Sequence, residues 1–532
     1  MSTSPTPQNT ATDHTAMPLY DLFVIGGGVN GCGIARDAAG RGLKVALAEM
    51  GDLAQATSST SSKLFHGGLR YLEYGEIRLV HEALKERETL LKAMPHIAHP
   101  MRFVLPLSRD MRFDTTTPIS RLLGLVMPWL KGRRPDWIIR IGLWMYDHLG
   151  KREILPGTSS YGLKDTPEGA PLQERFKKAF EYSDVWVDDA RLVVLNAMDA
   201  RDHGARIMTR ATVTSAQREG DVWQIEVQGH GTLRAKALVN AGGPWVADIL
   251  SGVLGENSSE RVRLVRGSHI IVPRLYDHDK AYFLQGTDGR IIFFLPFQTD
   301  FTMIGTTEAP HETDPLGAEA TFEEKRYLLD FANHYLKTPL TQADIVHSFA
   351  GVRPLYEDGA SSATAATREY VLSLNTNGAP LLNVFGGKIT TYRKLAEAAL
   401  AKLGDHVAMG PAWTAGAALP GGFTYGHDDI QINDLMRQFP FVSRRNATRL
   451  IHLYGRNAAG IFDDVVGASD MGRDFGHGLT EAELRYLIRE EFAREVEDVI
   501  WRRTKLGLRL SAAEIAAIDD WMRQHVPLLV DP

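Results

Sequence analysis

The chain has 532 residues, of which 44% are hydrophobic and 23% charged, the balance of an ordinary globular protein with about three or four domains. Its 59 basic and 65 acidic residues give a net charge of −6, which argues against a disordered chain and against a generally basic nucleic-acid binder. A single cysteine, Cys32, excludes an intrachain disulfide and any zinc or iron–sulfur site that needs several cysteines. A reducing compartment such as the cytoplasm is therefore expected.

The first eighteen residues are polar and rich in Ser, Thr and Pro. They lack the basic start and apolar run of a secretory signal and the arginines of a transit peptide, so we expect a disordered tail over residues 1–18. No later apolar stretch reaches about 18 residues, so no membrane-spanning helix is expected.

A glycine-rich turn follows this tail. Residues 21–25 predict a buried strand, and Gly26, Gly28 and Gly31 then form a G-x-G-x-x-G pattern that opens a predicted helix. A second strand is predicted over 43–48. Strand, motif, helix and strand in this order indicate a dinucleotide site rather than a chance glycine-rich turn.

Each position in this unit suits one part of a dinucleotide. The first glycine makes the tight turn, the second lets the backbone approach a pyrophosphate, and the third lets helix and strand pack closely. Glu49 ends the second strand, where its carboxylate would accept hydrogen bonds from an adenosine ribose. The residues assigned to the cofactor here are Gly26, Gly27, Gly28, Val29, Asn30, Gly31 and Glu49.

The segment after Glu49 indicates which dinucleotide is bound. A nicotinamide dehydrogenase would normally continue with further βαβ units, whereas six hydroxyl-bearing residues follow here at 57–62. Such a run can lie along an extended flavin and bond its phosphates and ribityl chain. A flexible linker is the alternative, but the abrupt change to Lys63, His66 and Tyr71 argues against it. FAD is the expected cofactor, and this segment adds Asp52, Leu53, Thr57, Ser58, Ser62, Lys63, Leu64 and His66 to its site.

The window 101–140 carries eight basic and three acidic residues in a chain that is acidic overall. Within it, the apolar run 122–130 is followed by Lys131, Arg133 and Arg134. An apolar face beside a basic flank, with tryptophans at its edge, is typical of a helix lying on an anionic membrane surface. A core helix with a solvated basic end fits equally well, so both interpretations remain open.

A second glycine-rich turn occurs more than 300 residues after the first. A strand is predicted over 381–385, a turn over 386–391 and a helix over 392–400, whose N-terminus could stabilise the anionic edge of a reduced flavin. A third close approach of the backbone to the cofactor is predicted at Gly242 and Gly243, which follow the strand 236–240. The late cofactor residues are Gly242, Gly387, Lys388 and Thr390.

These separated turns predict the fold class. We expect an α/β protein with a Rossmann-like FAD-binding domain assembled from distant segments, an inserted mixed-sheet domain that caps the substrate, and a C-terminal helical domain. Strand patterns at 223–227, 261–265, 291–295 and 302–306 suit the roof of the substrate site. The expected division assigns 19–110, 181–260 and 345–415 to the FAD domain, 111–180 and 261–344 to the cap, and 416–532 to the helical domain.

The charged run Arg502, Arg503, Thr504 and Lys505 lies in this helical region. It is either an interface or a solvated helix end, and the sequence slightly favours the solvated end.

Several longer motifs resemble the respiratory, FAD-dependent glycerol-3-phosphate dehydrogenase family, and the likeness runs from about Leu19 to the C-terminal helices. The motifs that carry it are SSKLFHGGLRYLE at 61–73, EYSDVWVDDARL at 181–192, GSHIIVPR at 267–274, GVRPL at 351–355, FGGKITTYRKLAE at 385–397 and FGHGLTEAELRYL at 475–487.

This resemblance implies oxidation of sn-glycerol 3-phosphate to dihydroxyacetone phosphate by hydride transfer to flavin N5, with electrons passed to membrane quinone. It also implies a homodimer in the cytoplasm, held peripherally on the anionic inner face of the cell membrane, with no nucleic-acid partner. The stretch 109–134 is longer than in the family, so it is either the shared membrane surface or a lineage-specific loop.

The family's substrate residues carry over to Arg70, Tyr71, Arg353, Arg368 and Lys388. Guanidinium groups suit phosphate oxygens, while Lys388 could serve the phosphate or charge on the reduced flavin. Arg353 and Lys388 thus count as catalytic candidates, whereas Arg368 could simply pair with its neighbouring acid.

Oxidation of an alcohol also needs a base near the hydroxyl, and His66 and His269 are the two candidates. His66 is favoured because it lies beside glycines that would contact the flavin. Two other functions remain open from the sequence: an oxidase of the same fold that passes electrons to oxygen, and a non-catalytic flavoprotein that binds a phosphorylated metabolite.

Overall fold

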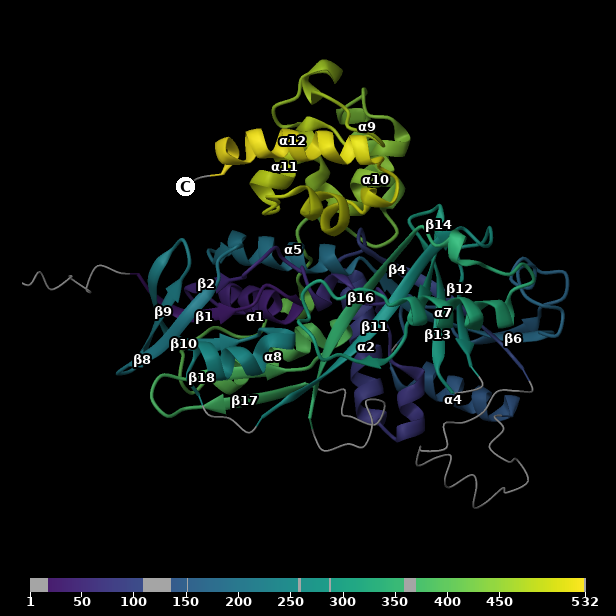
Figure 1. Ribbon diagram of the computed structural model, residues 1–532, viewed down its shortest axis with the longest axis horizontal. Coiled ribbons are helices and arrows are strands. Elements are labelled where there is room, and N and C mark those ends of the chain that lie inside the picture. The colour runs from purple at the N-terminus through teal and green to yellow at the C-terminus, as the bar shows by residue number, and fades with distance from the viewer. Residues whose placement is uncertain are drawn as a thin grey trace, which may run out of the picture.

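The computed structural model describes residues 18–108, 135–150, 152–256, 260–286, 289–357 and 370–530. Two large sheets form the body of the molecule, and a helical unit sits against one side of it, at the top of Figure 1. Nearly all of the tail expected to be disordered, and the apolar and basic run 122–134, lie outside the described residues.

The first sheet contains eight strands, and its centre is parallel: β1 pairs with β2 and β10, and β10 pairs with β18. In spatial order the main strands are β17 (Val371–Asn375), β18 (Leu381–Phe385), β10 (Gly231–Asn240), β1 (Leu19–Ile25), β2 (Val45–Ala48) and β7 (Arg206–Met208), with β9 (Val222–Val227) on β10 and β8 (Val213–Glu219) on β9. Three neighbouring strands thus come from widely separated parts of the chain, as the sequence predicted.

Three helices pack together beside this sheet: α1 (Val29–Gly40), α5 (Asp189–Asp202) and α8 (Tyr392–Leu403). Their apolar side chains share one buried core with the strands. The start of α5 is set by Asp188, whose carboxylate accepts the Arg191 N–H at 3.1 Å, the usual role of Asp before a helix.

The second sheet has ten strands and is mostly antiparallel. In order these are β15 (Ala309–Pro310), β11 (Val262–Pro273), β14 (Phe301–Gly305), β13 (Ile291–Phe297), β12 (Ala281–Gln285), β4 (Ala98–Pro106), β6 (Lys178–Val187) and β3 (Leu64–Phe65), with β16 (His347–Tyr356) on β11 and β5 (Ser159–Gly162) on β6. Helices α2 (Ile77–Ala93) and α4 (Asp136–Leu149) share one core with it, and α7 (Phe322–Tyr335) shares another.

The strand pairing differs from the sequence expectation for several strands. Within the ranges expected for the FAD domain, β3, β4, β16 and most of β6 belong to the second sheet. Strand β9, whose pattern was expected to suit the roof, pairs with β10 in the first sheet. Periodicity identifies a strand but not its partner, so sequence patterns alone could not assign these strands to a sheet.

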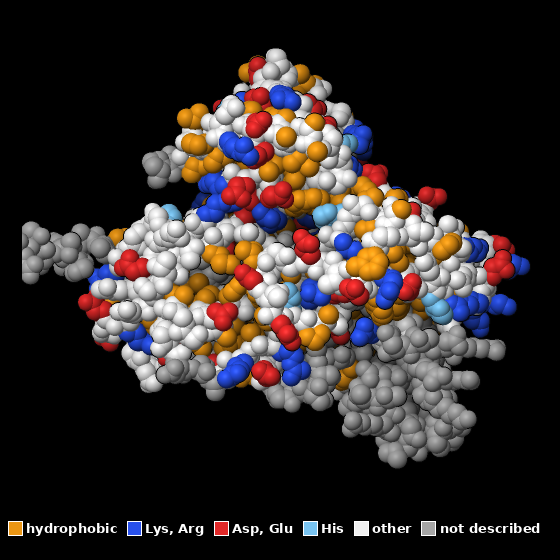
Figure 2. Space-filling view, in the orientation of Figure 1, with side chains coloured by type: hydrophobic (Ala, Val, Ile, Leu, Met, Phe, Trp, Pro, Cys, Tyr) orange, Lys and Arg blue, Asp and Glu red, His pale blue; other side chains and the backbone are white. Residues whose placement is uncertain are grey.

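The C-terminal unit contains α9 (Asp428–Gln438), α10 (Arg444–Tyr454), α11 (Glu481–Glu490) and α12 (Ala512–Leu529) around its own apolar core. Side chains of both charges line the junction between this unit and the body (Figure 2). The solvated helix end favoured for residues 502–505 is wrong, because Arg503 is fully buried and Lys505 is 4% exposed. Their charges are met by carboxylates of the body, and the sequence pattern did not show this pairing.

Candidate functional site

The turn after β1 brings two backbone segments into close contact. Gly26 has a φ of +108°, a left-handed conformation that favours glycine, and a Cβ there would lie 2.6 Å from the carbonyl oxygen of Ala241. A Cβ on Gly31 would lie 1.9 Å from the carbonyl oxygen of Gly26. Neither position has space for a side chain, which is the close packing that the motif predicted.

The N-terminus of α1 opens directly from this turn. Its first turn holds no acidic residue, and its N-cap residue, Gly28, has no side chain to cap it. The Val29 N–H donates to the Ser58 hydroxyl at 3.0 Å. The positive end of the helix dipole is therefore directed at this cleft, where it would stabilise a pyrophosphate.

Glu49 lies beside the same turn at the end of β2. One of its carboxylate oxygens accepts the Gly27 N–H at 2.6 Å, and the other accepts the Gly51 N–H at 2.9 Å. Burial raises the pKa of this carboxyl, and the backbone hydrogen bonds oppose that rise. Each oxygen keeps a further lone pair, so the carboxylate can still accept hydrogen bonds from ribose hydroxyls.

The hydroxyl run 57–62 is anchored rather than flexible. The Thr57 hydroxyl donates to the Val352 carbonyl at 2.6 Å. Both the N–H and the hydroxyl of Ser61 donate to the Asp189 carboxylate, at 3.1 and 2.7 Å. The run therefore has a defined path along the cleft, as a segment that contacts a cofactor needs.

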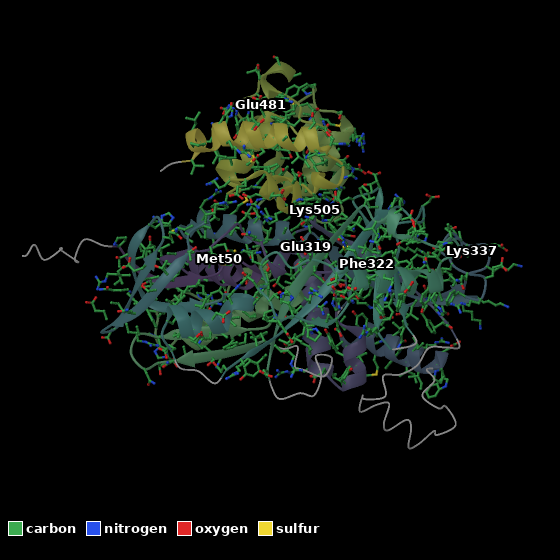
Figure 3. All side chains as sticks on the ribbon, in the orientation of Figure 1. Met50, Glu319, Phe322, Lys337, Glu481 and Lys505 are labelled. Carbon is green, nitrogen blue, oxygen red and sulfur yellow. The ribbon has the colours of Figure 1, made fainter. Side chains whose placement is uncertain are left out.

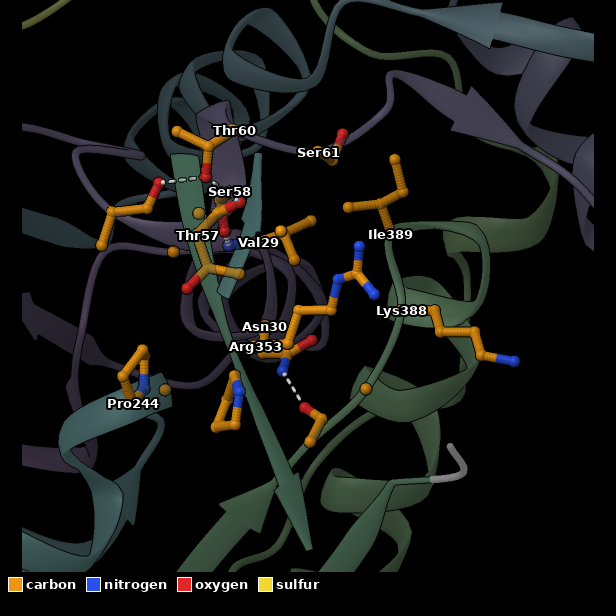
Figure 4. A pocket seen from close by; sticks show the side chains of 18 of the residues that line it. Val29, Asn30, Thr57, Ser58, Thr60, Ser61, Pro244, Arg353, Lys388 and Ile389 are labelled. Carbon is orange, nitrogen blue, oxygen red and sulfur yellow. Dashed lines mark hydrogen bonds between the residues drawn. The ribbon is translucent and has the colours of Figure 1, made fainter. Parts of the chain in front are cut away.

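The second glycine-rich turn lies in the same cleft. Gly386 and Gly387 have φ values of +70° and +104°, and the Asn30 side-chain amide donates to the Gly386 carbonyl at 3.0 Å, joining residues 356 positions apart. The side-chain carbonyl oxygen of Asn30 is buried without a hydrogen-bond partner among the described residues. In Figure 4, Thr57, Ser58 and Thr60 of the hydroxyl run lie on one side of Val29, with Lys388 and Ile389 on the other.

A cavity of about 560 Å³ connects the two glycine turns with the second sheet. Most of the residues expected from the sequence line it: Gly26, Gly28, Val29, Asn30, Glu49, Thr57, Ser58, Ser62, Leu64, His66, Tyr71, Gly242, His269, Arg353, Gly387, Lys388 and Thr390. Both ends of the expected site thus open into one continuous space.

Five expected cofactor residues do not line the cavity: Gly27, Gly31, Asp52, Leu53 and Lys63. Their contacts place them behind the lining residues. Asp52 pairs with Arg503, and Lys63 pairs with Asp189. The backbone of Arg70 belongs to the short helix Leu69–Tyr74, but its side chain, like all of Arg368, lies outside the described structure.

Two cations line the cavity near the second glycine turn. Arg353 projects from β16, where one guanidinium nitrogen donates to the Thr306 hydroxyl at 3.3 Å and another lies 3.5 Å from a Glu308 carboxylate oxygen. The Lys388 ammonium lies 3.8 Å from the centre of the Tyr71 ring, a cation–π contact. A guanidinium fork and an ammonium in one cavity can bind a phosphate group.

The two candidate bases differ in environment. His66 lines the cavity, and its backbone N–H donates to the Thr390 hydroxyl of the second turn at 3.3 Å. His269 is 1% exposed, and its Nε2 lies 3.0 Å from the Ser62 hydroxyl. Burial, with Arg353 and Lys63 nearby, lowers the pKa of His269 to about 3. That imidazole is therefore neutral at physiological pH.

A buried network supports the turn that carries His66. The Tyr146 hydroxyl of α4 accepts the Gly67 N–H at 2.8 Å and donates to the Asp184 carboxylate at 2.7 Å. Arg87 of α2 donates to the same carboxylate at 2.6 Å. Burial raises the pKa of Asp184, although Arg87 and Tyr146 oppose the rise. The network fixes the backbone one residue after a candidate base.

Sequence reasoning missed this network and several other lining residues. Asp184 lies inside one of the family-like motifs, which was the one available signal for it. Glu308 and Thr306 follow β14 without any motif, and their link to Arg353 depends on how β11, β14 and β16 pair. The further lining side chains that were missed include Tyr182, Phe283, Arg290 and Phe293.

No helix in the described residues is long and apolar enough to cross a membrane. No group of three or more His, Cys, Asp and Glu side chains there lies close enough together to hold a metal ion.

These features fit an extended FAD. The first glycine turn and the α1 N-terminus suit the pyrophosphate, Glu49 suits the ribose, and the hydroxyl run and Asn30 offer polar atoms along the cleft. The second glycine turn has left-handed residues that let backbone approach a planar ring.

Comparisons with known proteins agree with this fit. The family described as FAD dependent oxidoreductase matches residues 21–393, and the C-terminal domain of alpha-glycerophosphate oxidase matches residues 412–526. The chain is 48% identical to the glycerol-3-phosphate dehydrogenase of Pseudomonas aeruginosa, covering 96% of both chains. It is 46% identical to the aerobic glycerol-3-phosphate dehydrogenase of Escherichia coli, covering 96% of this chain and 98% of that one.

A third relative has another named substrate. The D-erythritol 1-phosphate dehydrogenase of Brucella abortus is 49% identical over 94% of this chain and 97% of its own length. Among solved structures, the Bacillus halodurans glycerol-3-phosphate dehydrogenase complexed with FAD has a similar fold, with a TM-score of 0.68 and 23% identity over 97% of this chain and 96% of that chain. FAD is the cofactor, and the chain belongs to the FAD-dependent glycerol-3-phosphate dehydrogenase family of oxidoreductases.

Proposed function

We propose that the protein oxidises sn-glycerol 3-phosphate to dihydroxyacetone phosphate and passes the electrons to membrane quinone. The observation that carries this proposal is the cavity lined by two cations suited to a phosphate, Arg353 and Lys388, and by both glycine turns. The near full-length relatives named dehydrogenases support this acceptor over oxygen. Bound FAD supplies the two-electron acceptor for the hydride that leaves the carbinol carbon.

In this proposal the cations hold the substrate by its phosphate. The Arg353 fork can bind two phosphate oxygens, and Lys388 contributes a second positive charge. Before the substrate binds, Thr306 and Glu308 keep the guanidinium in place through their contacts at 3.3 and 3.5 Å. Binding at the phosphate then orients the reacting hydroxyl within the cavity.

His66 is the proposed base. It accepts the hydroxyl proton as the hydride leaves, which turns the secondary alcohol into a ketone. His269 also lines the cavity, but its pKa of about 3 makes it a weak proton acceptor at neutral pH. Its hydrogen-bonding distance from Ser62 suits a role in holding the hydroxyl run.

A longer polyol phosphate is a second candidate substrate. The relative named for D-erythritol 1-phosphate is as similar to this chain as the relatives named for glycerol 3-phosphate. Both substrates carry a phosphate at one end, so Arg353 and Lys388 would serve either. A comparison of kcat/KM for the two compounds decides between them.

Peripheral membrane binding, the cytoplasmic location and the homodimer belong to the same proposal. Helix α4 supports a membrane contact, because Trp137, Ile141 and Trp144 are 50, 51 and 59% exposed and lie at helical spacings of four and three. Tryptophans beside Arg140 suit a membrane interface. Replacing the three apolar residues by serine should release the protein from anionic vesicles, and unchanged co-sedimentation would count against the contact.

The experiment that tests the reaction is anaerobic reduction of the purified holoenzyme. Adding sn-glycerol 3-phosphate should bleach the flavin absorbance, and a quinone analogue should restore it. In a parallel aerobic assay, turnover with the quinone analogue should form little peroxide. Arg353→Gln should raise the substrate concentration needed for bleaching about a hundredfold, because a charged hydrogen bond to phosphate contributes roughly 1.5–3 kcal/mol. Arg263→Gln on the neighbouring β11 is the matched control. A flavin that stays oxidised with either polyol phosphate would refute the proposal.

A further inference from the structure

The basic run at 502–505 contacts two loops of the FAD domain. It belongs to the C-terminal unit, where the π-helical turn Asp498–Arg503 is followed by Thr504 and Lys505. Figure 3 labels Lys505 at the base of the helical unit, next to the body. The side chains of Arg502, Arg503 and Lys505 are 13, 0 and 6% exposed. Three cations are thus withdrawn from water at a domain junction.

Two of the cations meet the loop that follows Glu49. The guanidinium of Arg503 contacts both carboxylate oxygens of Asp52, at 2.7 and 2.8 Å, and Arg502 contacts one of them at 2.5 Å. Asp52 follows Gly51, whose N–H is donated to the Glu49 carboxylate at 2.9 Å. The arginines therefore hold the short loop that fixes the expected ribose-binding group.

The third cation acts beside the hydroxyl run. Lys505 contacts both carboxylate oxygens of Asp188 at 2.6 Å. The adjacent Asp189 contacts the Lys63 ammonium at 2.7 Å and accepts both the N–H and the hydroxyl of Ser61. Two neighbouring carboxylates are thus balanced by two lysines, one from each domain.

The Lys505–Asp188 ion pair is needed to balance buried negative charge. Asp188 and Asp189 are 3 and 0% exposed, and burial would raise the pKa of Asp188 if Lys505 and Lys63 did not lower it. Loss of Lys505 leaves two buried carboxylates facing Lys63 alone. Removing one partner of a buried ion pair is strongly destabilising, because the other charge stays uncompensated. The segment that carries Ser61 and Lys63 bears this destabilisation.

We propose that Arg503 and Lys505 are positioning residues for FAD, through which the C-terminal domain fixes both the ribose end and the hydroxyl run of the cofactor site. Neither side chain lines the cavity. They act through Asp52 and Asp188 on residues that do.

FAD affinity of the full-length protein tests this proposal. Lys505→Met should weaken FAD binding at least about tenfold, which corresponds to 1.4 kcal/mol, and should speed FAD release, measured by the recovery of flavin fluorescence. Arg449→Met is the matched control, since Arg449 forms a comparable pair with Glu483 at 2.7 Å inside the C-terminal unit. The control should lower the unfolding temperature and leave FAD affinity within about twofold.

A rescue variant separates positioning from general destabilisation. Lys505→Met combined with Asp188→Asn removes both charges, and asparagine caps a helix about as well as aspartate, so α5 keeps its start. FAD affinity should return toward that of the wild type. If Lys505→Met fails to fold, Arg502→Gln at the less buried position should still weaken FAD binding about threefold. Unchanged FAD affinity in a folded Lys505→Met or Arg502→Gln protein would overturn the proposal, as would equal loss in the Arg449→Met control.

Discussion

The nucleotide end and the proposed substrate end of the cavity are built differently. The nucleotide end consists largely of backbone from one short stretch, in which Gly26, Gly31 and the start of α1 make contacts that exclude any side chain. The substrate end is made of side chains from distant elements, such as Tyr71, Arg353 and Lys388. A site built from backbone can be blocked by a single added methyl group. In a site built from side chains, each substitution removes only part of the binding free energy.

The largest effect that tests this comparison is expected at Gly31. Gly31→Ala would place a Cβ 1.9 Å from the carbonyl oxygen of Gly26. We expect FAD binding to weaken about a hundredfold or more, since so short a contact forces overpacking at the upper end of the usual range of about 1–3 kcal/mol, and the purified protein should lack flavin absorbance. Gly142→Ala is the control, because a Cβ at that helical glycine meets no atom within 4 Å. A yellow, FAD-saturated Gly31→Ala protein would contradict the backbone description.

The next effect concerns the two histidines of the substrate end. His66→Asn should slow anaerobic flavin reduction about 10²- to 10⁴-fold, the usual contribution of a general base, while FAD content stays unchanged. His269→Asn should slow it about tenfold or less, because a neutral imidazole with a pKa of about 3 accepts protons poorly. Stopped-flow absorbance measures both. The reverse ranking would make His269 the base.

A smaller effect is expected from the support behind His66. Tyr146→Phe removes the hydroxyl that accepts the Gly67 N–H at 2.8 Å and leaves Asp184 without one of its donors. Loss of such buried hydrogen bonds costs about 1–3 kcal/mol, and we expect kcat to fall about tenfold at unchanged FAD content. Tyr335→Phe, which removes a hydroxyl bonded to the Gln285 carbonyl at 2.6 Å, is the control. Equal activity of both variants would show that the turn does not need the network.

The smallest effect is on the pH dependence of stability. Burial lowers the pKa of His269 from 6.5 to about 3. The unfolded chain therefore binds this proton at higher pH than the folded protein, so the free energy of unfolding falls as the pH drops from about 6.5 toward 3. His269→Asn should make that fall shallower by up to about 1.4 kcal/mol per pH unit in urea titrations. An unchanged slope in His269→Asn would show that the histidine is not buried in its neutral form.

The sequence predicted the nucleotide end of the cavity better than the proposed substrate end. Local spacing determines the backbone path at the glycine turns and at the end of β2. The turn at Gly26–Gly31, the carboxylate of Glu49 and the later turn at Gly387 were therefore predictable. Assembly of these distant segments into one parallel sheet was also predictable, since strand-to-helix turns of this kind meet at the same sheet edge.

The rest depends on partners that no local pattern specifies. The contact of Glu308 with Arg353 requires the order of strands in the second sheet, and the Tyr146 network requires α4 to pack against the Gly67 turn. The burial of Arg503 was mispredicted because a run of charges is usually solvated, whereas here the Asp52 carboxylate and the Glu491 carbonyl satisfy the guanidinium.

The pairing of β1 with β10 and of β10 with β18 has a consequence for biosynthesis. During translation, β1 can pair early with β2, but its second parallel neighbour, β10, is complete only when residue 240 has been made, and the glycine turn after β18 is made nearly 150 residues later still. Contacts of such long sequence separation form slowly and leave strand edges exposed meanwhile. The nascent polypeptide therefore acquires its cofactor only once about three quarters of its length has left the ribosome.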